Sequence, residues 1–154
     1  WANNNIQVSL QNNNGVTAHV LLVQKVPRVE VTVTLQRLIQ HDSSGLWFVT
    51  QAQSRSLTLD TASANSTITS PLPFNMSNMP NGGTITITLF NHALKPIPIN
   101  FRSKQDTSGQ TGGRVSGTIS FSALVPDQPG LLLLMQLAPD KQSGQLLLRS
   151  FILE

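Results

Sequence analysis

Residues that could support catalysis occur together in one short segment between two predicted strands. The segment His41-Asp42-Ser43-Ser44 contains the base, acid and hydroxyl types of a serine hydrolase. A hydrolase collects these groups from separate elements, whereas here they are sequence neighbours followed by Gly45, which is typical of a turn. The chain also has no Gly-x-Ser-x-Gly motif. The sequence therefore predicts a hairpin turn here and predicts that the protein is not an enzyme.

Metal ligands are sparse. Three histidines and no cysteine give no spacing typical of a zinc site. Asp106, Asp127 and Asp140 lie in separate predicted loops, and a calcium site would require them to converge at one end of the domain. Because loop carboxylates ordinarily form turns, we expect neither a metal nor another cofactor.

Sugar binding by β-domains depends on exposed aromatic rings, which stack on sugar faces. The chain has two Trp, six Phe and no Tyr. Four phenylalanines fall at strand positions that suit a core, namely Phe90, Phe101, Phe121 and Phe151. Trp47 lies within a predicted strand and is the aromatic candidate for a ligand contact.

A polar, glycine-rich segment from Ser103 to Gly113 is predicted to be a long exposed loop. Loops at the ends of β-sandwiches often carry recognition, but this one has no aromatic anchor, which favours a flexible hairpin connection. Together with Trp47, the interaction candidates are Arg102, Lys104 and Asp106.

The basic charge does not indicate nucleic-acid binding. The formal net charge is +3 and the pI is about 10. Phosphate recognition needs clustered Lys and Arg, and the ten basic residues are scattered along the chain. We expect no nucleic-acid partner.

The composition favours an exported protein. Charged residues make up 11% of the 154 residues, where about 25% is usual, and Ser, Thr, Asn and Gln take their place. The absence of cysteine leaves packing as the source of stability. No apolar run reaches the roughly 18 residues of a membrane span. We expect an extracellular or cell-envelope location without a membrane span.

Alternation with a period of two predicts strands from the beginning of the chain. Ile6, Val8 and Leu10 alternate with polar residues, Asn14-Gly15 is a strong hairpin signal, and further strands follow at 16–24, 29–36, 46–52 and 57–59. Residues 1–60 are therefore predicted to form an antiparallel β-meander.

A second unit is predicted after the small, polar linker at 61–67. Strand patterns at 84–90, 97–102, 114–122, 131–137 and 145–153 are separated by turn signals, while residues 71–83 read as a proline- and asparagine-rich stretch. This spacing is typical of a β-sandwich, which we place at residues 66–154. The predicted fold class is thus all-β, with a meander followed by an immunoglobulin-like sandwich.

The second unit resembles the immunoglobulin-like domains of bacterial spore-germination proteins and envelope lipoproteins. The matching segments are Ile68-Thr69-Ser70-Pro71, Gly117-Thr118-Ile119-Ser120-Phe121, Pro129-Gly130 before Leu131, and the turn Asp140 to Gly144. The resemblance covers about ninety residues. It implies a non-catalytic domain of the envelope.

The first unit is similar to the final strands of the nuclear-transport-factor-like cone fold. The segment Gly45-Leu46-Trp47-Phe48-Val49-Thr50 matches a pattern that the last strand of that fold often carries. The resemblance implies a longer protein in which preceding helices cover the curved sheet. An uncovered apolar face of such strands would be an association site.

Two functions follow from these observations. The first is a non-enzymatic structural or protein-interaction module of the bacterial envelope or extracellular space, with a protein partner or self-association. The alternative is a module that binds carbohydrate or another cell-wall ligand.

Overall fold

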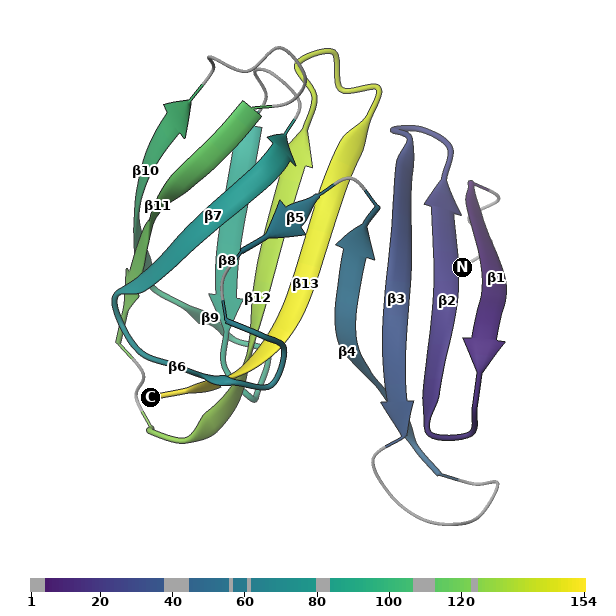
Figure 1. Ribbon diagram of the computed structural model, residues 1–154, viewed down its shortest axis with the longest axis horizontal. Helices are drawn as coiled ribbons and strands as arrows, with labels where there is room; N and C mark the ends of the chain where they lie inside the picture. The colour runs from purple at the N-terminus through teal and green to yellow at the C-terminus, as the bar shows by residue number, and fades with distance from the viewer. Residues whose placement is uncertain are drawn as a thin grey trace.

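The computed structural model of the protein is shown in Figure 1. In the residues that it describes, all of the regular secondary structure is β-strand. For residues 78, 79 and 103–106 only the backbone is described. The described residues are 5–37, 45–55, 57–60, 62–79, 84–106, 113–122 and 125–154. Within them, no helix is long and apolar enough to cross a membrane. The predicted all-β class with antiparallel sheets is confirmed.

Thirteen strands are assigned in the described ranges. They are β1 (Ile6–Asn13), β2 (Thr17–Gln24), β3 (Val29–Arg37), β4 (Trp47–Ser54), β5 (Thr58–Leu59), β6 (Thr67–Ile68), β7 (Leu72–Met79), β8 (Thr84–Phe90), β9 (Pro96–Ile97), β10 (Ile99–Asp106), β11 (Gly113–Phe121), β12 (Gln128–Leu137) and β13 (Gly144–Leu153).

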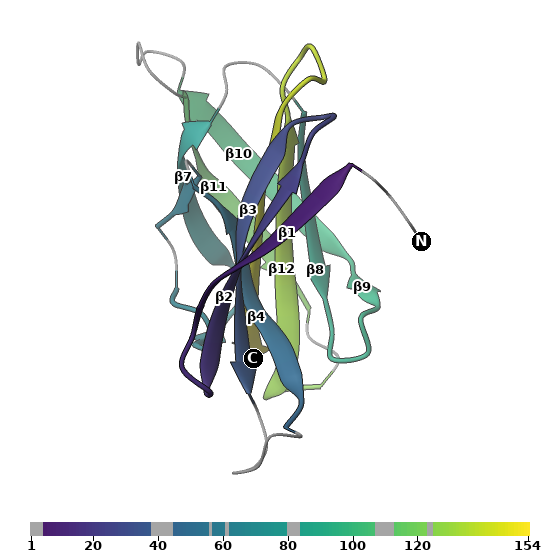
Figure 2. The same ribbon diagram turned by 90° about the vertical axis from the view of Figure 1, so that its right-hand side faces the viewer.

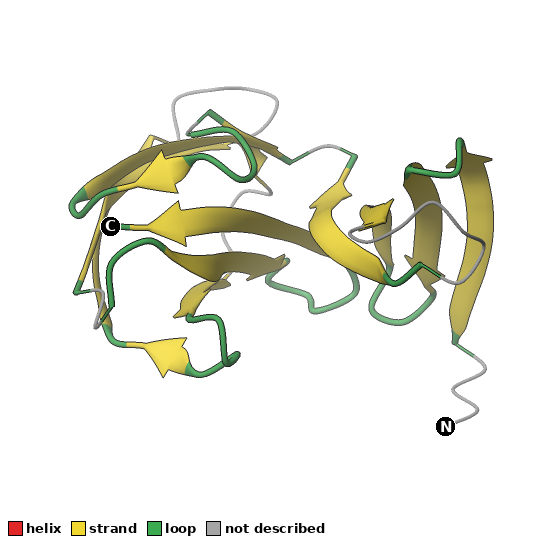
Figure 3. Ribbon diagram, turned by 90° about the horizontal axis from the view of Figure 1, so that it is seen from below, coloured by secondary structure: helices red, strands yellow, loops and turns green. Residues whose placement is uncertain are grey.

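The strands form a nine-stranded and a four-stranded sheet. The large sheet has the order β1-β2-β3-β4-β13-β12-β8-β9, and β6 pairs in parallel with β13. The small sheet has the order β10-β11-β7-β5. Figure 3 shows the small sheet facing one part of the large sheet, while the meander β1–β4 extends the large sheet to the side.

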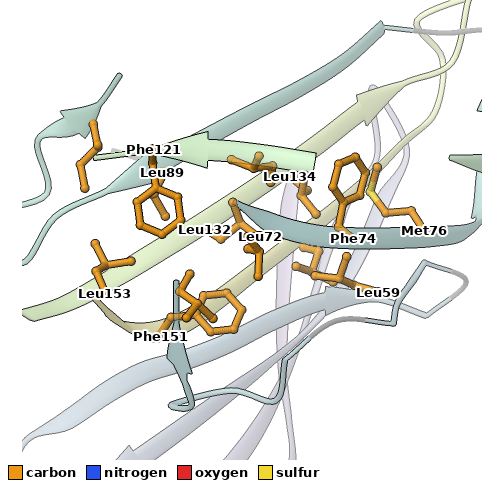
Figure 4. Packing of buried hydrophobic residues seen from close by; sticks show 14 of the residues in the cluster. Leu59, Leu72, Phe74, Met76, Leu89, Phe121, Leu132, Leu134, Phe151 and Leu153 are labelled. Carbon is orange, nitrogen blue, oxygen red and sulfur yellow. The ribbon is translucent and has the colours of Figure 1, made fainter. Parts of the chain in front are cut away.

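The main core lies between the small sheet and the part of the large sheet that faces it. This core contains Phe74 and Met76 of β7, Leu132 and Leu134 of β12, and Phe151 of β13, and Figure 4 shows Phe74 beside Leu134. All five side chains are almost fully buried. Fully burying one such side chain contributes about 1.5–3 kcal/mol, so this cluster is the main source of stability.

The first hairpin forms where the sequence predicts it. Gly15 has a φ of +84°, which glycine adopts without strain. The Asn14 side-chain oxygen accepts hydrogen bonds from the Val16 and Thr17 backbone N–H groups at 3.0 and 2.7 Å. The Asn-Gly pair therefore fixes the β1–β2 turn through both backbone conformation and side-chain bonding.

Two segments differ from the prediction, namely β7 and the start of the predicted long loop. No strand was predicted in residues 71–83. Leu72–Met79 form β7, and the side chains of Leu72, Phe74 and Met76 point into the core of the sandwich. Pro73 is tolerated because β5 pairs only with the far end of β7, at Ser77 and Met76. Ser103 to Asp106 belong to β10 rather than to a loop, and residues 107–112 lie outside the described residues.

The two predicted units share one sheet. β4 pairs with β13 through Gln51–Gln53 and Leu147–Arg149, so the meander joins the sandwich edge to edge and does not pack on it. β5, which lies within the predicted first unit, pairs with β7. The division at residues 61–65 stays a prediction.

Candidate interaction surface

The outer face of the large sheet, which points away from the small sheet, is apolar. In β12, Leu132 and Leu134 point into the sandwich, so Leu133 and Met135 point outward. Met135 lies opposite Leu146 of β13, which carries the apolar surface into the next strand.

The same face is apolar in the meander. Val8 of β1 lies opposite Leu22 of β2, and Leu22 lies opposite Val31 of β3. A second, smaller core cluster forms on this face. Its buried members are Val31, Val33 and Ala52, and the side chains packed against them are Leu22, Val29, Leu35, Leu146 and Leu148.

Two adjoining hollows make this face concave. One, of about 190 Å³, is lined by side chains as far apart in the sheet as Ile6 of β1 and Leu146 of β13. The other, of about 270 Å³, is lined by Val29, Thr86 and Met135. Val29 and Leu146 line both hollows, so the two form one continuous apolar groove. Figure 2 shows that the large sheet is strongly twisted, with β1 running obliquely to the direction of β12.

The described part of the chain leaves the apolar groove open to solvent. None of the buried residues of the main core cluster comes from β1–β4. At the two ends of the groove, Ile6 is 45% and Met135 40% exposed. Apolar side chains that stay exposed at both ends of a groove are the kind of surface that marks interaction sites.

The opposite face of the meander is more polar. Gln7 and Ser9 of β1 lie on it, as do His19 and Thr34, whose Nδ1 and Oγ1 atoms are 3.3 Å apart. The groove face is therefore the more apolar side of the meander, because the opposite face combines these polar side chains with Leu21 and Val23.

A separate cleft of about 400 Å³ opens where β4 diverges from β13 (Figure 1). The β4–β13 pairing ends at Gln51, so the side chains of Phe48 and Val49 line the cleft. Phe48 is 43% exposed. The polar side chains that line the cleft include Asn65 and His92.

The polar groups of this cleft are held in place by hydrogen bonds. Ser150 Oγ lies 3.0 Å from the Thr50 carbonyl oxygen and also within hydrogen-bond distance of Asn65 Oδ1, and its single O–H donates to one of these two acceptors. His92 Nδ1 lies 2.8 Å from Gln128 Oε1. A ring beside fixed amide, imidazole and hydroxyl groups has the chemical character of a site for a small polar ligand.

The sequence-predicted site residues do not gather at one place. Trp47 begins β4 and is 37% exposed, next to Phe48 but not among the residues lining the cleft. Arg102 is exposed on β10, an edge strand of the small sheet. Figure 1 shows β10 far from β4. Lys104 and Asp106 lie on β10, and their side chains are outside the described residues.

The catalytic and metal-binding residues considered in the sequence fall partly within the described residues. His41, Asp42, Ser43 and Ser44 lie outside the described residues. In the ranges that are described, no group of three or more His, Cys, Asp or Glu side chains could hold a metal ion.

Arg149 is one of the ten basic residues scattered along the sequence, and it is buried in the structure. It is only 9% exposed, and its Nη1 donates to the carbonyl oxygens of Leu59 and Ala62 at 3.4 and 3.1 Å. Desolvation by burial lowers the pKa of Arg149. Its position in the inward row of β13, between Leu147 and Phe151, was the available signal.

No protein-family model, curated protein or solved structure matched this chain in the three comparisons made.

Proposed function

We propose that this protein is a non-enzymatic structural or protein-interaction module of the bacterial cell envelope or extracellular space, and that it acts through the apolar groove. The observation that carries the proposal is the exposure of groove side chains on both units, from Ile6 to Met135. Removing apolar surface from water is favourable, so binding of a partner that covers the groove would be stabilised by this burial.

The immunoglobulin-like character of the sandwich is part of the proposal. The small sheet order β5-β7-β11-β10 and the large sheet order β13-β12-β8-β9 correspond to the A-B-E-D and G-F-C-C′ orders of that fold. This correspondence supports the resemblance drawn from Ile68-Thr69-Ser70-Pro71 and the other matching segments. The low charge content supports an exported location.

The concave meander likewise supports the resemblance of the first unit to the cone fold. Its apolar side is the concave side, and Val31 and Val33 are buried there by neighbouring strands. A partner with an apolar row of side chains, such as an amphipathic strand or helix, would complete this face.

Photo-crosslinking in the native host tests this function. A photoreactive amino acid replaces Met135 in the groove, and in a matched control it replaces Ser120, which is exposed on β11 of the small sheet. We expect discrete cross-linked protein species from position 135 that are absent from position 120. Equal or no cross-linking at the two positions would contradict a groove-mediated interaction.

The cleft beside Phe48 favours a second function, binding of carbohydrate or another cell-wall ligand. An exposed ring next to Asn65 and His92 could stack on a sugar face and bond its hydroxyls. A glycan panel, run with and without calcium, tests this candidate. Binding that is lost in Phe48→Ala and retained in Phe101→Leu, a change within the sandwich, would support it, and absence of binding to every glycan would remove it.

A further inference from the structure

Among the described residues, the strand orders of the two sheets end in four edge strands, and three of these carry features that discourage further pairing. β5 and β9 are two residues long, and Pro96 lies in β9. β10 contains Arg102, Lys104 and Asp106. Short length, proline and charge are the usual protections of sheet edges. β1, the fourth edge, has none of them over its regular stretch Ile6–Leu10, before the bulge that follows Leu10.

The free backbone groups of β1 can be assigned from one hydrogen bond. The Lys25 N–H donates to the Asn5 carbonyl oxygen at 3.1 Å, so Asn5 bonds toward β2. In an antiparallel ladder the residues that bond to a given neighbour alternate. Ile6, Val8 and Leu10 therefore direct their N–H and C=O groups away from β2, toward the open edge.

The same three residues are exposed through their side chains. Val8 is 67% and Leu10 62% exposed, although both are apolar. No residue of β1 is charged. The edge thus offers open backbone groups and an apolar row at the same positions, and no charge opposes the approach of a second strand.

We propose that β1 pairs in antiparallel fashion with β1 of a second copy of this chain, about a twofold axis at Val8. Val8 then lies opposite Val8 of the second copy, and Ile6 lies opposite Leu10. Each of these opposed pairs exchanges two backbone hydrogen bonds, because all of the residues bond outward. The proposal rests on the part of the proposed function that expects self-association, and it names a second copy of the chain as a partner.

The geometry favours a second copy over an unrelated strand because the edge is complementary to itself. The twofold places apolar side chains of both copies on the same face, and no like charges meet. Ile6 also lines the apolar groove, so the paired strands make the grooves of the two copies continuous. A contact through one strand from each copy is small, so we expect a dimer that depends on protein concentration.

Sedimentation velocity over a concentration series tests the dimer. Val8→Pro removes an outward N–H that β2 does not use, so the chain keeps its fold and loses the intermolecular bonds. Two lost bonds should weaken dimerisation about tenfold or more. The matched control Val8→Ile keeps the N–H and should dimerise as the unchanged protein does, and circular dichroism checks that all three proteins are folded.

Cross-linking tests the register. The chain has no cysteine, so Val8→Cys introduces a single thiol. A short bis-maleimide should link two copies through position 8, whereas Ser143→Cys, exposed in the β12–β13 turn, should not be linked. Equal linking at both positions would contradict the twofold at Val8.

Two outcomes would overturn the edge pairing without touching the proposed function. A monomer at every concentration would do so, and the cross-linking at Met135 would still report on the groove. A dimer that persists in Val8→Pro and is lost in Met135→Lys would show assembly through the groove itself. Conversely, a Val8-dependent dimer with no cross-linking at Met135 would keep the pairing and reject a groove partner.

Discussion

The Ser54 hydroxyl oxygen accepts a hydrogen bond from the Leu146 backbone N–H at 2.9 Å, across 92 positions of sequence. Ser54 is buried at the end of β4, just beyond the three residue pairs that join β4 to β13. A side chain thus lengthens the short junction between the meander and the sandwich. The hydroxyl satisfies a backbone donor that the ladder leaves unpaired.

Replacing Ser54 by Ala should weaken this junction. The Leu146 N–H would lose its acceptor at a partly buried position, which lowers the free energy of unfolding by about 1–2 kcal/mol. Urea denaturation measures the loss, and hydrogen exchange should quicken at Leu146 and its neighbours in β13. Ser143→Ala, at an exposed turn, should change stability by no more than about 0.5 kcal/mol. Unchanged exchange at Leu146 would contradict the role of the hydroxyl.

Arg149→Met should destabilise the sandwich although it removes a buried charge. The substitution leaves the carbonyl oxygens of Leu59 and Ala62 without their donor, and we expect a loss of about 1–3 kcal/mol in urea denaturation. Arg102→Met, the matched change at an exposed arginine, should be nearly neutral. If the two variants were equally stable, the Arg149 contacts would contribute nothing to folding.

Gly130→Ala should destabilise the protein through a steric clash. A Cβ at Gly130 would lie 2.6 Å from Leu153 Cδ1 and 2.9 Å from the Phe90 carbonyl oxygen, which belongs to the backbone of β8. Overpacking of this kind costs about 1–3 kcal/mol. Ser120→Ala, at an exposed position of β11, is the control and should be nearly neutral. Thermal unfolding should show a lower Tm only for Gly130→Ala.

The meander should open before the sandwich does. Its core cluster has three buried residues, Val31, Val33 and Ala52, whereas the main cluster is much larger. Local opening free energies follow such differences in buried contacts. Native-state hydrogen exchange under mild denaturant should therefore release the amides of β2 and β3 before those of Leu132 and Leu147. Simultaneous exchange of the amides of β2, β3, β12 and β13 would instead indicate that the meander and the sandwich unfold as a single cooperative unit.

The long strands could be predicted from sequence because period-two alternation is a local signal. β7 carried the same signal in Leu72, Phe74 and Met76, but Pro73 and the asparagines masked it. The pairing of β4 with β13 could not be predicted, because alternation gives the faces of a strand and not its neighbour. The apolar groove and the cleft beside Phe48 depend on that pairing and on the twist of the sheet, so they could not be predicted from sequence either. Trp47 was placed correctly in a strand, and its neighbour Phe48 was overlooked.

The position of β13 has a consequence for biosynthesis. The strand lies between β4 and β12 and also takes β6 as a partner, yet it is made after all of them. Translation proceeds at about 5–20 residues per second, so β4 waits on the order of 5 to 20 seconds for the segment that completes it. Throughout that interval the nascent chain exposes an incomplete sheet with an apolar side, which makes it a natural client for a chaperone at the ribosome.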